Sequence, residues 1–96
     1  MKRKNFTILL VDDSESVLTL IKSQLKLAGY SKILTASDGL MGIAAVEESL
    51  KKGMQIDLIL SDYNMPHMNG IEFLSSLRSH NNPMIKNISF LIFLFH

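Results

Sequence analysis

Four short apolar runs, alternating with segments of helical character, constrain the fold of this chain more than any other feature. The runs cover residues 6–11, 31–36, 56–61 and 88–94 of a sequence of 96 residues. The first is almost continuously apolar and partly β-branched, and the third and fourth are similar, which is typical of strands buried in a sheet. We therefore predict four β-strands at these positions.

Three segments of helical spacing lie between the runs, at residues 14–29, 39–52 and 70–78. The first two are followed or ended by glycines, which commonly terminate helices. The second and third begin after residues whose side chains cap helices, Asp38 and Asn69. Asn69 has Glu72 three positions further on, as in a capping box. These segments are predicted to be helices.

The resulting order of strands and helices places the chain in the α/β class, as a doubly wound parallel sheet with helices on both faces. Crossovers between parallel strands are expected to be right-handed. In such sheets, ligands bind beyond the carboxyl ends of the strands, where the strand order reverses. A chain of this length suits one domain, residues 1–96, rather than two.

Acidic residues follow two of the predicted strands. Asp12 and Asp13 follow the first, and Asp62 follows the third. If these strands are neighbours, the three carboxylates converge at one edge of the sheet. Such charges repel unless a cation lies among them, and a hard divalent ion with oxygen ligands fits. Mg²⁺ often binds one or two carboxylates together with a phosphate, which favours phosphoryl transfer and a carboxylate nucleophile.

A single aspartate at a strand end is more often a helix cap or a turn residue. The combination here is more specific, because Asp62 lies in the string S-D-Y-N-M-P. Pro66 would fix the loop that follows, and Asn64 would offer its backbone carbonyl to the same site. The pattern therefore indicates a shared site at this edge of the sheet.

Composition limits the partners of the chain. Its formal net charge is +1 without an extended basic stripe, which argues against a nucleic-acid or membrane surface. It has no cysteine, so disulfides and thiolate metal sites are excluded. The apolar stretches near both ends are shorter than the roughly 20 residues that span a bilayer. We expect a cytoplasmic protein.

Three strings, ILLVDDSESVLTLIKSQLKLAGY, ASDG and DLILSDYNMPHMNGIEFL, resemble the receiver domain of two-component response regulators, and most of all the stand-alone chemotaxis type. The resemblance implies the flavodoxin-like receiver fold, with a five-stranded parallel sheet in the order 2-1-3-4-5. It implies that Asp62 accepts a phosphoryl group from a histidine kinase. It also implies that Asp13, Asp62 and the carbonyl of Asn64 hold Mg²⁺, with Asp12 assisting through water, and that Asn64 influences hydrolysis of the phosphate.

The resemblance breaks down in the fourth apolar run. The family carries a Ser or Thr at the carboxyl end of strand four and a Lys at the end of strand five. Here Leu94 and Phe95 stand where the hydroxyl is expected, while Ser89 and Lys86 lie at or before the start of the run. We therefore expect a C-terminally truncated receiver that lacks the fifth strand and the last helices. Phosphorylation should be weak and switching impaired.

An uncovered fourth strand would be an apolar sheet edge, and such edges recruit other chains. We expect a homodimer or a larger homo-oligomer, formed through this edge or through the face of the first helix. The alternative function is a pseudo-receiver or interaction module, or a truncated gene product that oligomerises without phospho-switching.

An aspartate-nucleophile phosphohydrolase is a third class. It would require an acid two residues after the nucleophile, where Asn64 or Ser14 stands. The three histidines lack zinc-ligand spacing and are expected at the surface, although His96 at the end of the fourth run could approach a phosphate. Met65 and Met68 are expected to pack beneath the loop after Asp62.

Overall fold

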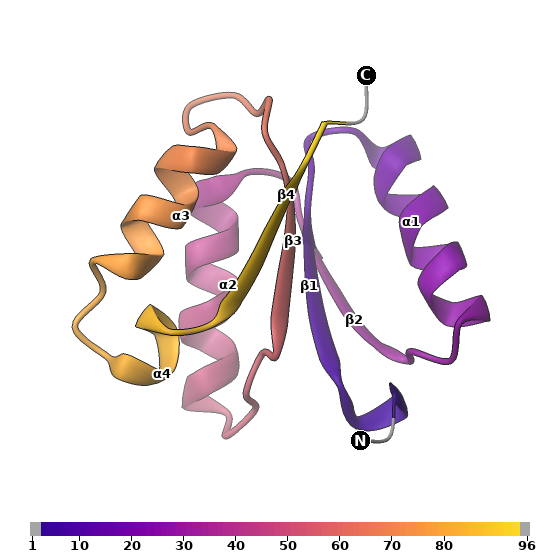
Figure 1. Ribbon diagram of the computed structural model, residues 1–96, viewed down its shortest axis with the longest axis horizontal. Coiled ribbons are helices and arrows are strands. Elements are labelled where there is room, and N and C mark those ends of the chain that lie inside the picture. Colours follow the sequence, from indigo (N-terminus) through magenta and orange to yellow (C-terminus); the bar gives the residue numbers. More distant parts are fainter. Residues whose placement is uncertain (1–2, 95–96) are drawn as a thin grey trace.

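The computed structural model describes residues 3–94 and contains the predicted alternation of strands and helices (Figure 1). A short 3-10 turn, η1 (Arg3–Asn5), precedes the first strand. The elements that follow are β1 (Thr7–Val11), α1 (Glu15–Leu27), β2 (Lys32–Ala36), α2 (Gly39–Lys51), β3 (Leu58–Asp62), α3 (Gly70–Arg78), α4 (Pro83–Lys86) and β4 (Ser89–Phe93).

All four strands belong to one parallel sheet in the order β2-β1-β3-β4. Strands β1 and β3 are neighbours, which is the condition for their acidic ends to meet. The register pairs Leu9 with Ile59 and Val11 with Ser61, so both strands reach the same edge of the sheet. The α/β class and the order of these strands are therefore confirmed.

Helices cover both faces of the sheet, with α1 on one face and α2, α3 and α4 on the other (Figure 1). Ile8 and Leu10 of β1 belong to the core on the α1 side. Leu9 and Val11 belong to the core on the other side, together with the fully buried Phe73 of α3. Successive residues of a strand point to opposite faces, which explains why every residue of β1 is apolar or buried.

The predicted helix signals act as expected. The Asp38 side chain accepts a hydrogen bond from a backbone N–H in the first turn of α2. Asn69 and Glu72 form both halves of the capping box at the start of α3. Gly29 and Gly53 follow α1 and α2 with φ angles of 103° and 76°, a conformation that glycine adopts without a steric penalty.

The one-turn helix α4 is an element that the sequence pattern does not predict. Its local signals are present, because the Asn82 side chain accepts from the N–H of Met84 and Pro83 occupies the first turn. Four residues are too few to show helical periodicity. Within residues 3–94, none of the helices has the length and apolar character needed to cross a membrane.

Candidate functional site

The first acidic pair lies directly after β1, at the carboxyl edge of the sheet. Asp12 is completely buried, and its Oδ1 accepts a hydrogen bond of 2.8 Å from the backbone N–H of Ser14. Ser14 in turn caps α1 by accepting from the N–H of Val17. This turn fixes the Asp12 carboxylate between the strand and the helix. Asp13 is exposed beside it.

The second acidic position is Asp62, the last residue of β3, which is also completely buried. Backbone hydrogen bonds fix the chain next to it. The N–H of Tyr63 donates to the carbonyl of Phe93 in β4 at 2.9 Å, and the N–H of Gly70 donates to the carbonyl of Tyr63 at 2.8 Å. The end of β3 is therefore held both by the neighbouring strand and by the start of α3.

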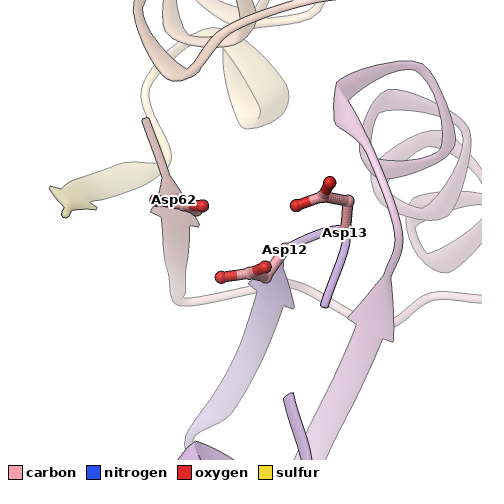
Figure 2. Close-up of side chains that lie close together, drawn as sticks. All are labelled: Asp12, Asp13 and Asp62. Atoms are coloured by element: carbon pink, nitrogen blue, oxygen red, sulfur yellow. The ribbon is translucent and has the colours of Figure 1, made fainter. Parts of the chain in front are cut away.

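Three carboxylates gather beyond the ends of β1 and β3 (Figure 2). One oxygen from each of Asp12, Asp13 and Asp62 lies within 4.8 Å of the other two. Oxygen ligands of Mg²⁺ lie at about 2.1 Å, which places adjacent ligands about 3 Å apart and opposite ligands about 4 Å apart. The donor set therefore fits a hard divalent cation after small adjustments of the side chains, and the exposed Asp13 can move most easily.

Two glycines allow the loop and helix around the site to approach closely, and the sequence pattern does not single them out. A Cβ at Gly70 would lie 2.8 Å from the backbone oxygen of Asp62, and a Cβ at Gly39 would lie 2.7 Å from the sulfur of Met68. Each glycine stands directly after a capping residue, where a better helix former is expected, and this was the available signal. Met65 and Met68 pack against the core, as predicted.

The other predicted residues near the site lie at its margins. Asn64 is exposed in the loop between β3 and α3. Leu94 directly follows Phe93, which is level with Asp62 in the sheet. An apolar side chain that is 70% exposed therefore stands at the carboxyl end of β4. Two further expectations, the position of Phe95 and the approach of His96 to a phosphate, lie outside the described residues.

The remaining histidines are remote from catalysis or only partly exposed. His67 is exposed, with a left-handed φ of 69°. His80 is less exposed than the sequence suggested, because its Nε2 lies 3.0 Å from a carboxylate oxygen of Glu47 and its Nδ1 accepts from the N–H of Asn82. Lys86 belongs to α4, which precedes β4 and so lies toward the amino ends of the strands.

Comparisons with known proteins agree with this geometry. The family described as "Response regulator receiver domain" matches residues 8–91. The chain is 37% identical to chemotaxis protein CheY-3 of Vibrio cholerae over 76 residues, which are 79% of this chain and 55% of that protein. It is 43% identical to the alkaline phosphatase synthesis transcriptional regulatory protein PhoP of Bacillus subtilis, over 77% of this chain and 28% of that protein. The chain thus spans about half the length of the first relative and less of the second.

Solved structures lead to the same family. The chemotaxis response regulator CheY4 of Vibrio cholerae matches with a TM-score of 0.76 and 33% identity, over 91% of this chain and 66% of that one. The CheY chain in a CheX-CheY-BeF3-Mg²⁺ complex from Borrelia burgdorferi matches with a TM-score of 0.76 and 28% identity, over 91% of this chain and 60% of that one. The parallel sheet, the acidic cluster at its carboxyl edge and these matches show that the chain belongs to the response regulator receiver domain family.

Proposed function

We propose that this chain is the phosphoacceptor receiver of a two-component system and that Asp62 takes the phosphoryl group. The observation that carries the proposal is a completely buried aspartate at the end of β3, with oxygens of two further carboxylates within 4.8 Å. In a doubly wound sheet, ligands bind at the carboxyl ends of the strands where the strand order reverses, which here is the edge shared by β1 and β3.

The proposed reaction requires little covalent chemistry from the protein. A carboxylate oxygen of Asp62 attacks the phosphorus of a phosphohistidine, so that a P–O bond forms while the P–N bond breaks. The departing imidazole keeps the electron pair and takes up a proton. Catalysis of such transfers is mostly positioning and charge neutralisation. The domain therefore acts as a signalling module, and we propose that the aspartyl phosphate hydrolyses only slowly without a partner.

We also propose that Asp12, Asp13, Asp62 and the backbone carbonyl of Asn64 hold Mg²⁺, with Asp12 acting through water. The all-oxygen donor set and the crowding of three carboxylates support this assignment. The related complex from Borrelia burgdorferi, which contains Mg²⁺ and BeF3, supports it as well. When bound, the ion supplies positive charge that neutralises the oxygens of the phosphoryl group.

Intact-protein mass spectrometry tests the phosphoacceptor directly. Incubation with Mg²⁺ and phosphoramidate should add one phosphoryl group to the chain and none to Asp62→Asn. Asp57→Asn is a matched control, because Asp57 lies just before β3 and its Oδ2 accepts from the N–H of Thr7 at 2.8 Å, at the opposite edge of the sheet. Equal labelling of the parent chain and Asp62→Asn would refute the assignment, as would unchanged labelling in excess chelator.

We propose that switching is impaired, because the carboxyl end of β4 offers Leu94 where a hydroxyl would meet the phosphoryl group. Leu94 is 70% exposed, so Leu94→Thr should not disturb the core. The new donor should raise the initial rate of phosphorylation at least about tenfold, since one well-placed donor can contribute about 10²-fold. Leu91→Thr, at a leucine of the same strand that is 58% exposed, is the matched control. Equal rates for both variants would contradict the proposal.

We propose a histidine kinase as the phosphodonor and a cytoplasmic location, where the relatives' signalling role places a receiver. The second candidate is a pseudo-receiver or interaction module, and the exposed Leu94 is the observation that favours it. A folded chain that binds Mg²⁺ but is not labelled would establish this second candidate. Association with a second copy stays a prediction under either function.

A further inference from the structure

Strand β4 is an outer edge of the sheet in the part of the chain that the structure describes. From Ser89 to Phe93, one side of the strand pairs with β3. The opposite side directs its backbone N–H and C=O groups away from the sheet, which gives a template for pairing with another strand. Figure 1 shows no further element beyond β4 in residues 3–94.

The edge at β4 lacks the features that protect natural sheet edges. Its sequence from Ser89 to Leu94 contains neither a charged residue nor a proline. The other edge, β2, differs because it begins with the exposed Lys32, and Lys22 of α1 lines a small hollow together with Thr35 of β2. Charges of this kind oppose pairing between identical edges. Only the β4 edge can therefore meet a copy of itself without like charges.

Apolar side chains continue from the β4 edge onto one face of the sheet. Leu91 is level with Leu60 of β3, and Leu60 packs against the core on the α1 side. Leu91 is 58% exposed, although it lies in the middle of a strand, and Leu94 just beyond the strand is 70% exposed. The edge and its adjoining face thus present apolar surface and unpaired strand backbone together, which is the combination that a second strand would cover.

We propose that β4 pairs with β4 of a second copy of this chain, in antiparallel orientation, about a two-fold axis beside Leu91. Antiparallel pairing of two identical edges is self-complementary, because each copy offers the same donors and acceptors to the other. In this register Leu91 faces Leu91 of the copy, and Ser89 faces Phe93 of the copy. Two four-stranded sheets become one continuous sheet, and no charge has to be desolvated. The two-fold axis uses each edge once, so association stops at a dimer.

Sedimentation velocity on the chain, from about 1 to about 100 µM, tests the dimer. We expect a monomer–dimer equilibrium that Leu91→Lys weakens at least about tenfold, since two like charges then face each other across the axis. Leu91→Glu should have the same effect, and an equimolar mixture of these two variants should dimerise again. Leu27→Lys is the control, because Leu27 is an 84% exposed leucine of α1 and should not alter the equilibrium.

The absence of cysteine allows a second test of the register. Leu91→Cys should form an intermolecular disulfide under mild oxidation, because directly opposed strand residues have the Cβ separation that a disulfide needs. Thr35→Cys on the β2 edge should not. A clean monomer at all concentrations would overturn the proposal and leave the edge to a different chain. Larger polymers would also overturn it, as would a dimer that is insensitive to Leu91→Lys and is not cross-linked by Leu91→Cys.

Discussion

Replacing Asp12 by asparagine separates the charge of the acidic cluster from its geometry. The amide oxygen of asparagine can still accept the hydrogen bond that Asp12 Oδ1 receives from the N–H of Ser14. The turn into α1 should therefore survive while one buried negative charge disappears. Without a divalent ion, we expect Asp12→Asn to be more stable than the parent chain.

The magnitude follows from the separation of the carboxylates. Asp12 and Asp62 are both completely buried, and their facing oxygens lie within 4.8 Å. At an effective dielectric constant of about 20, two such charges repel by about 3 kcal/mol. Unfolding separates the charges, so this repulsion lowers the free energy of unfolding of the metal-free chain. Removing it should raise Tm by about 10 °C or more, since 1 kcal/mol corresponds to roughly 4–8 °C in a domain of this size.

Mg²⁺ should change the comparison, because an ion that binds only the folded state stabilises it. At ten times the dissociation constant, the gain is about 1.4 kcal/mol, or roughly 5–10 °C in Tm for the parent chain. Asp12→Asn should show less than half of this response, because one carboxylate of the cluster is gone. The order of stabilities is therefore expected to approach equality as the Mg²⁺ concentration rises.

Thermal unfolding followed by circular dichroism, in chelator and over a Mg²⁺ titration, measures both effects. Asp57→Asn is the control, because it also removes a carboxylate that accepts a backbone N–H, at 2.8 Å, but outside the cluster. It should leave the Mg²⁺ response unchanged and should not stabilise the metal-free chain. The reasoning fails if Asp12→Asn is less stable than the parent chain in chelator, or if it keeps the full Mg²⁺ response.

Three further substitutions test the scaffold around the site. Asn69→Ala removes the capping box of α3 and should lower the free energy of unfolding by about 1 kcal/mol in urea denaturation. Gly42→Ala would place a Cβ 2.7 Å from the ring of buried Phe73 and should cost about 1–3 kcal/mol, although alanine favours helices. Gly39→Ala should cost less, because its Cβ meets the flexible end of a methionine. Gly70→Ala would displace α3 from the carbonyl of the acceptor aspartate and should slow labelling by phosphoramidate at least about tenfold.

Each of these expectations has a clear contrary result. A stable Gly42→Ala would show that the ring of Phe73 has room that the packing does not indicate. Unchanged labelling of Gly70→Ala, in a variant with unaltered circular dichroism, would show that the position of α3 does not control the acceptor. Full stability of Asn69→Ala would mean that water replaces the capping box without loss.

Much of the fold is predictable from the sequence because its signals are local. Apolar runs mark the strands, and capping residues such as Asp38 and Asn69 mark where helices begin. The meeting of Asp12 with Asp62 follows from a general rule of parallel sheets, once their strands are taken as neighbours. No distant information is needed for these steps, and the structure confirms the elements and the convergence.

The features that escape sequence reasoning depend on contacts between distant segments. Gly70 looks like an ordinary first residue of a helix, and its need for a missing side chain appears only when the carbonyl of Asp62 is placed beside it. His80 looks like a surface histidine until α2 brings Glu47 to 3.0 Å from it. The short helix α4 has capping signals but no period. Tertiary packing decides such positions, and local patterns do not encode it.

The packing of Met68 against Gly39 links the loop beside the acceptor to the first turn of α2. The two positions share one volume, so neither can change size alone. A methyl group added at position 39 calls for a shorter side chain at position 68, and a shorter side chain at 68 would leave a void against the helix. We therefore expect the two positions to vary together as receivers diverge, and the pair Gly39→Ala with Met68→Val to be better tolerated than Gly39→Ala alone. The loop that shapes the site thus inherits its evolutionary freedom from a helix that contributes no residue to the acidic cluster.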